Sequence, residues 1–144
     1  MRREADATVL AFDFGTRRIG VAVGNTLLRV AHPLATIDAA DTAARWSAIG
    51  ALLDEWRPQR LVVGLPVHAD ATEHAMTARA REFAHELAGR YALPVAFEDE
   101  RHTSETARDA LAAAGRGGRA RRGQRDRVAA QIILQAWFDE RHDA

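Results

Sequence analysis

The chain has 144 residues and a formal net charge of zero, because 20 arginines balance 20 acidic residues; it contains no lysine. Such a length predicts a single domain at residues 1–144, and the absence of cysteine excludes disulfide frameworks and thiolate metal sites. With no signal peptide and no apolar run near the roughly 18 residues of a membrane span, we expect a cytoplasmic protein without membrane association.

The first predicted elements are strands. Residues 9–14 and 19–24 are apolar and are separated by the tetrapeptide GTRR, which predicts a β-hairpin. Residues 29–37 are typical of a third strand, in which Pro33 requires an edge position or a bulge.

Helices and strands alternate in the rest of the chain. Trp46, Ile49 and Leu53 recur at helical spacing, which predicts an amphipathic helix that starts at Thr42 and ends before Pro58. The later expected elements are a strand at 60–65 covered on both faces, a helix at 72–90, a strand at 93–98, a helix at 103–114, a loop at 115–123 and a closing helix at 126–141.

This order of elements predicts an α/β fold with a five-stranded mixed sheet flanked by helices. Hairpins pair antiparallel, whereas strand–helix–strand units are parallel and right-handed. In open α/β sheets the working site lies outside the carboxyl ends of the strands, so the polar residues there are the functional candidates.

Acidic residues stand at the ends of elements that are far apart in the sequence. Asp13 interrupts an apolar strand, a Glu-Asp-Glu cluster at 98–100 closes the last strand, and Asp126 opens the final helix. If these segments are neighbours, their carboxylates repel one another and raise each other's pKa unless a cation joins them. Oxygen ligands without Cys or paired His favour Mg²⁺ or Mn²⁺, and such a site suits phosphoryl chemistry.

Each acid also has a structural interpretation. Asp13 could cap the hairpin, the cluster at 98–100 could be a solvated strand end, and Asp126 could be a helix N-cap. Other site types are excluded, because the chain has no P-loop, no His-Glu-x-x-His and no Gly-x-Ser-x-Gly, and its six histidines lack ligand spacing.

Four motifs, in order, resemble those of one bacterial protein family. Residues 10–24 read LAFDFGTRRIGVAVG, residues 62–66 VVGLP, residues 99–101 DER and residues 125–130 RDRVAA. Together they resemble the YqgF/RuvX family, described as Holliday-junction-resolvase-like or as pre-16S rRNA nucleases. The resemblance implies an RNase H-like fold and metal-dependent cleavage of nucleic acid in 5′-end maturation of 16S rRNA.

The resemblance also implies a site. Asp13, Glu100 and Asp126 match the family's acidic metal-binding positions, so we expect them to hold Mg²⁺ or Mn²⁺ in a two-metal scheme, with Asp13 bridging both ions. Asp99 is an alternative ligand. Residues 68–71 depart from the family pattern and keep only its aspartate, Asp70.

Two further motifs bear on the substrate. Residues 102–104 keep the hydroxyls of the family pattern, and Arg127 replaces a small residue beside the last acid. The central strand ends in Gly-Leu-Pro at 64–66, where RuvC resolvases carry an acid, which favours cleavage of single-stranded RNA over junction resolution.

Arginines near the acids are the candidates for phosphate binding. They are Arg17, Arg18, Arg101, Arg119, Arg121 and Arg122. The expected partners are precursor rRNA, presented as a single strand, and the assembling small ribosomal subunit. The alternatives are a Holliday-junction-resolvase-like DNA nuclease, a nucleotide-binding module with the phosphate hairpin of actin-like ATPases, and a non-catalytic RNase H-like module that docks RNA or protein.

The distribution of charge changes the meaning of zero net charge. By itself that balance argues against a nucleic-acid binder. Residues 115–127 contain six arginines and one acid, a net +5, and the rest of the chain carries −5. The segment holds four glycines, so residues 115–125 are expected to form a mobile basic loop that follows a phosphate backbone, unless it is only a solvated loop.

Overall fold

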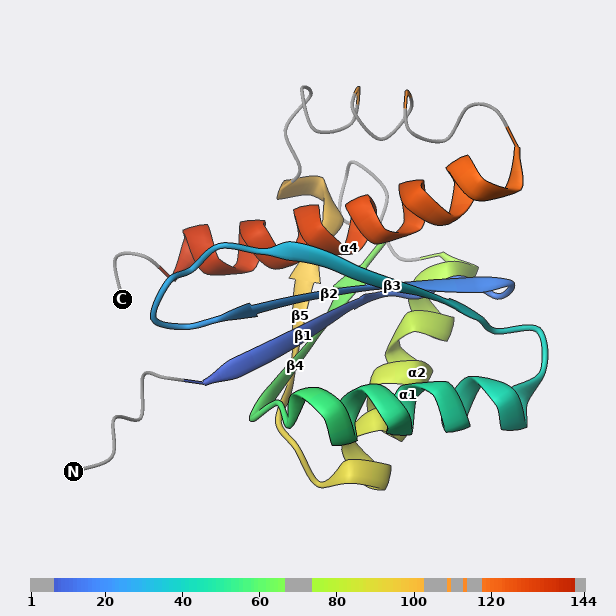
Figure 1. Cartoon of the computed structure of the whole chain (residues 1–144), viewed down its shortest axis with the longest axis horizontal. Helices are drawn as coiled ribbons and strands as arrows, with labels where there is room; N and C mark the ends of the chain where they lie inside the picture. The colour runs from blue at the N-terminus through green and yellow to red at the C-terminus, as the bar shows by residue number, and fades with distance from the viewer. Residues whose placement is uncertain (1–6, 67–73, 103–108, 110–112, 114–117, 142–144) are drawn as a thin grey trace.

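The structure, a computed structural model, describes residues 7–66, 74–102, 109, 113 and 118–141 of the chain (Figure 1). The elements are β1 (Thr8–Asp13), β2 (Arg18–Asn25), β3 (His32–Asp38), α1 (Thr42–Trp56), β4 (Arg60–Leu65), α2 (Ala75–Tyr91), β5 (Val95–Asp99), the short 3₁₀ helix η1 (Glu100–His102) and α4 (Arg119–Glu140). In these described ranges, no helix is both long and apolar enough to cross a membrane.

The strands form one mixed sheet in the order β3-β2-β1-β4-β5, which confirms the predicted architecture. The first three strands pair antiparallel, and β4 runs parallel to both β1 and β5. Pro33 lies on the edge strand β3, beside a shift in register, as its missing N–H requires. The carboxyl ends of β1, β4 and β5 therefore meet at one rim of the sheet.

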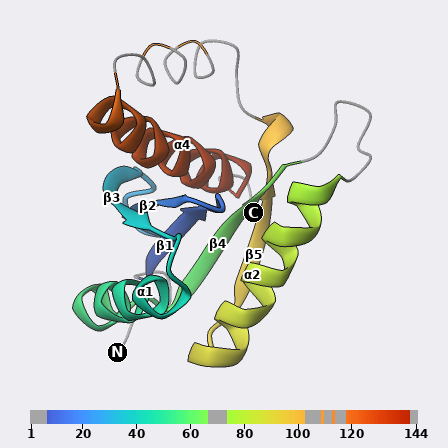
Figure 2. The same ribbon diagram turned by 90° about the vertical axis from the view of Figure 1, so that its right-hand side faces the viewer.

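Helices cover both faces of the sheet: α4 lies on one face, and α1 and α2 lie on the other (Figures 1 and 2). The alternation of side chains along each strand explains the two layers. Leu10 and Phe12 of β1 point to the core shared with α1 and α2, whereas Val9 and Ala11 point to the core under α4.

Glycines in β2 let α4 lie unusually close to the sheet. A Cβ atom on Gly20 would lie 1.9 Å from the carbonyl oxygen of Asp126, and one on Gly24 would lie 2.7 Å from the ring of Phe138. Gly20 faces Asp13 across the β1–β2 ladder, so this close approach sets Asp126 beside the end of β1.

The predicted loop at 115–123 is wrong from Arg119 onward, because α4 begins there. Arginine is a good helix former, and the helix is held from outside, since the Thr36 hydroxyl donates to the carbonyl of Gly123 at 2.6 Å. Glycine and charge in this segment had indicated a loop. Most of the helix predicted at 103–114 lies outside the described residues, as do residues 115–117.

Candidate active site

The three acids of the predicted site lie at the same rim of the sheet. Asp13 is the last residue of β1, Glu100 directly follows β5, and Asp126 lies two turns inside α4. They are close enough that the charges of both Glu100 and Asp126 act on the ionisation of Asp13. Segments separated by more than a hundred residues of sequence thus contribute carboxylates to one cluster.

The cluster favours the protonated form of its central acid. Burial, followed by the charges of Glu100 and Asp126, raises the pKa of Asp13 to about 8, and the charge of Arg125 opposes this rise. Burial, followed by the charge of Asp99, also raises the pKa of Glu100. Carboxylates that repel one another in a partly enclosed site are stabilised by a shared cation.

The position of Glu100 depends on a glycine in the central strand. A Cβ atom on Gly64 would lie 3.0 Å from Oε2 of Glu100 and 2.4 Å from Cδ1 of Ile133. Because Gly64 has no side chain, Ile133 packs against β4 and the Glu100 carboxylate reaches across the strand. The glycine of the VVGLP motif therefore leaves room for an acid that comes from the neighbouring strand.

Asp126 is paired with an arginine. Its Oδ2 accepts a hydrogen bond from Nε of Arg18 at 2.5 Å; the aspartate side chain is 10% exposed and that of Arg18 is 32% exposed. Within the described part of the chain, no three His, Asp or Glu side chains already stand as ligands around a common point. The donor set nevertheless fits a hard divalent cation, because it consists of carboxylate oxygens from three neighbouring acids.

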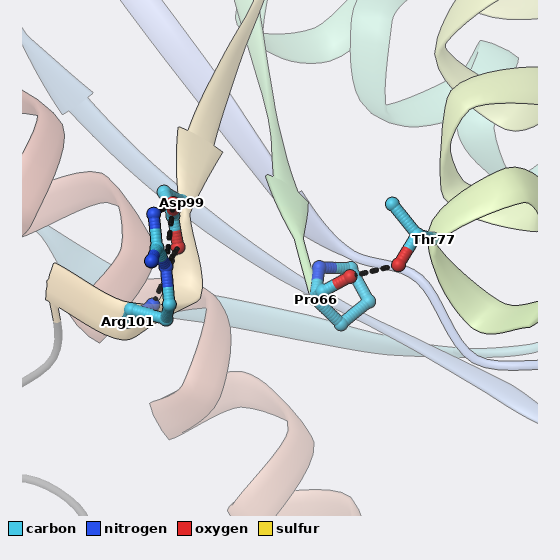
Figure 3. A network of polar contacts seen from close by, with 4 residues as sticks. All are labelled: Pro66, Thr77, Asp99 and Arg101. Carbon is cyan, nitrogen blue, oxygen red and sulfur yellow. Dashed lines mark hydrogen bonds and ion pairs between the residues drawn. The ribbon is translucent and has the colours of Figure 1, made fainter. Parts of the chain in front are cut away.

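Asp99 and Arg101 form a separate pair at the end of β5 (Figure 3). Nε of Arg101 donates to Oδ1 of Asp99 at 3.0 Å and to Oδ2 at 2.9 Å, and Nη2 donates to Oδ2 at 2.5 Å. This fork places the Arg101 guanidinium on Asp99, whose charge also acts on Glu100. Asp70 lies outside the described residues.

The predicted phosphate-binding arginines fall into two groups. Arg17, Arg18 and Arg122 line one cavity of about 460 Å³ between the start of β2 and α4. Arg121 is exposed on α4, and Arg119 is the first residue of that helix. The structure therefore brings two arginines of the hairpin together with one of the basic segment.

Two residues near the site were not predicted from the sequence. The hydroxyl of Thr77, a buried residue of α2, donates to the carbonyl of Pro66 and so fixes the end of β4 (Figure 3). Thr36 accepts from Nη1 of Arg127 at 3.3 Å while it donates to α4. Threonines carry no distinctive signal, because their partners lie far away in the sequence.

Comparison with known proteins identifies close relatives. Residues 7–140 match the family RuvX, described as Holliday junction resolvase. A "putative pre-16S rRNA nuclease" of Chromobacterium violaceum is 54% identical over 132 residues, which cover 91% of this chain and 96% of that protein. A protein of the same name from Nitrosomonas europaea is 51% identical over 144 residues, which cover 100% of this chain and 97% of that one.

Solved structures share the fold. Thermus thermophilus RuvC in complex with a Holliday junction substrate superposes with a TM-score of 0.58 at 16% identity, covering 95% of this chain and 96% of that one. Fowlpox virus resolvase with Holliday junction DNA gives 0.56 at 8% identity, covering 92% and 97%. These likenesses confirm the expected RNase H-like fold. The match over residues 7–140 and the identity to these relatives show that the chain belongs to the RuvX family.

Proposed function

We propose that the protein is a metal-dependent nuclease that hydrolyses phosphodiester bonds of precursor 16S rRNA during maturation of its 5′ end, in the cytoplasm. The observation that carries this proposal is the coupled cluster of Asp13, Glu100 and Asp126 at the sheet rim. It is supported by relatives about half identical in sequence that bear the name of such a nuclease.

In this proposal the three carboxylates hold Mg²⁺ or Mn²⁺. When bound, such ions lower the pKa of the attacking water and stabilise charge on the phosphate and on the leaving oxygen. Asp13 would be the central ligand, because both other acids act on its ionisation, and its carboxyl group would have to release its proton to bind the cation. Glu100 and Asp126 would be the other two ligands; Gly64 leaves room for the Glu100 carboxylate, and Gly20 lets the backbone of Asp126 approach the sheet.

The arginines of the cavity supply the contacts to the strand. Arg17, Arg18 and Arg122 line this cavity, and Arg18 is paired with Asp126 of the acid cluster. A guanidinium is the side chain best suited to bidentate binding of phosphate. An RNA single strand presents its phosphates without a narrow groove, so its backbone reaches such a rim more easily than a duplex does. We propose that the assembling small ribosomal subunit presents the strand.

Substrate choice is the decisive test. Purified protein is incubated in Mg²⁺ with a precursor 16S rRNA fragment, single-stranded DNA of the same sequence and a four-way DNA junction. The proposal predicts cleavage of the RNA and loss of that cleavage in Asp13→Asn. Preferential cleavage of the junction would replace it with a resolvase activity, and binding without cleavage under every metal ion would replace it with a docking role.

A further inference from the structure

The ion pair between Arg18 and Asp126 occupies an acid that the proposed mechanism needs. The two residues are 108 positions apart in sequence, and the 2.5 Å contact joins Nε to Oδ2. A guanidinium neutralises a carboxylate much as a metal ion does. In the cation-free protein, the guanidinium of Arg18 therefore supplies the positive charge that neutralises the Asp126 carboxylate.

The cavity beside this pair has an excess of positive charge. Its lining consists of Arg17, Arg18, Thr36, Asp38, Ala40, Arg122 and Gly123. The one lining carboxylate, that of Asp38, accepts from the backbone N–H of Ala40 at 3.1 Å. In the part of the chain that the structure describes, neither Arg17 nor Arg122 forms an ion pair. An anion is the ligand that this lining favours.

The walls of the cavity are fixed to each other. Thr36 of the edge strand is opposite Gly20 in the β2–β3 ladder, donates to the carbonyl of Gly123 and accepts from Arg127. These bonds hold the sheet edge against the first turns of α4. The cavity is thus formed before any ligand arrives, which lowers the entropy cost of binding.

We propose that this cavity binds a backbone phosphate next to the reacting one, and that Arg18 transfers from Asp126 to that phosphate when a divalent cation binds the acids. The inference rests on the proposed function and adds a coupling to it. With a cation at Asp126, the Arg18 guanidinium would be repelled from this carboxylate, and the phosphate would offer it a new acceptor beside Arg17 and Arg122. Cation binding and strand binding then strengthen each other.

Cation affinity provides the first test. Mn²⁺ is titrated by calorimetry into wild type, Arg18→Gln and Arg17→Gln, without nucleic acid. Both variants lose one positive charge from the same cavity, but only Arg18 is bonded to Asp126. We expect Arg18→Gln to bind Mn²⁺ about tenfold more tightly than wild type, since a hydrogen bond to a charged group no longer competes, and Arg17→Gln to change affinity much less.

The salt dependence of RNA binding provides the second test. A short single-stranded RNA is titrated at several salt concentrations, once in EDTA and once in Ca²⁺, with its integrity checked on a gel. Each phosphate contact contributes about 0.7 to the slope of log affinity against log salt for single strands. We expect Arg17→Gln to lower the slope in both conditions, and Arg18→Gln to lower it in Ca²⁺ alone. In wild type, Ca²⁺ steepens the slope by about 0.7.

The outcomes separate the two proposals. If wild type binds both Mn²⁺ and the RNA but Arg18→Gln behaves like Arg17→Gln in both tests, the transfer of Arg18 is refuted and the nuclease proposal stands. A wild-type slope that is equal in EDTA and Ca²⁺ refutes the transfer without any variant. If wild type binds neither Mn²⁺ nor RNA, both proposals fail.

Discussion

The raised pKa of Asp13 predicts that the site destabilises the cation-free protein at neutral pH. Its pKa rises from 3.8 to about 8 on folding, so between these values the folded chain keeps a proton that the unfolded chain releases. The contribution of the Asp13 carboxyl group to the free energy of unfolding is therefore complete below about pH 4, and it falls as the pH rises toward 8. At 1.36 kcal/mol for each pKa unit, the loss at pH 7 has an upper limit of about 4 kcal/mol.

Replacing Asp13 by asparagine removes this loss, because the amide stays neutral at every pH. If structural relaxation halves the upper limit to about 2 kcal/mol, we expect Asp13→Asn in EDTA to melt about 10 °C above wild type at pH 7. Near pH 4 the two proteins should melt at the same temperature. The assay is thermal unfolding followed by circular dichroism from pH 4 to 8.5. Asp54→Asn, at an exposed carboxylate of α1, is the matched control and should follow wild type.

Mg²⁺ offsets the stability advantage of the asparagine variant. A ligand that binds only the folded state adds about 2.7 kcal/mol of stability at a hundred times its Kd, and the asparagine variant lacks the central carboxylate. Wild type should therefore gain melting temperature with Mg²⁺ while Asp13→Asn gains little. If the difference between the two proteins in EDTA is the same at pH 4 and pH 8, Asp13 does not hold the proton, and the reasoning is refuted.

Three further substitutions test how the chain holds the elements around the site. Gly20→Ala places a Cβ atom 1.9 Å from the carbonyl oxygen of Asp126; we expect a loss of more than about 2 kcal/mol in urea unfolding, because backbone must move. Gly89→Ala, at an exposed helical glycine with open space around its Cβ, should instead gain about 0.5–1 kcal/mol. Thr77→Val leaves the Pro66 carbonyl without its donor and should cost about 1–2 kcal/mol by thermal unfolding; an unchanged melting temperature would show that the bond contributes nothing.

The sequence pattern predicted most of the elements because their periods are strong. The apolar run at β4 matches the strand residue for residue, and Asp41 and Pro58 bracket α1 as capping and proline rules require. The start of α4 was missed because its first turns contain arginine and glycine, and their helical state depends on contacts with the edge strand. Local composition carries no information about such contacts.

The candidate site, like the fold, could be predicted from the sequence only in part. The acids could be proposed from their places at the ends of predicted strands and of a predicted helix and from the family motifs, and the structure groups them at one rim. The pairing of Arg18 with Asp126 could not be predicted, because it joins positions 108 residues apart and depends on Gly20 to bring α4 close. Asp99 and Arg101 are neighbours in sequence, yet only the structure shows their forked contact.

Cleavage of a precursor 16S rRNA fragment in Mg²⁺ by wild type, Asp126→Asn and Asp139→Asn tests the central claim most directly. Both aspartates lie on α4, but Asp126 belongs to the acid cluster and Asp139 is exposed near the end of the helix. The account predicts that wild type and Asp139→Asn cleave at equal rates, that Asp126→Asn is slower by at least roughly a hundredfold, and that EDTA stops all three. Equal rates for Asp126→Asn and wild type, or cleavage that persists in EDTA, would contradict it.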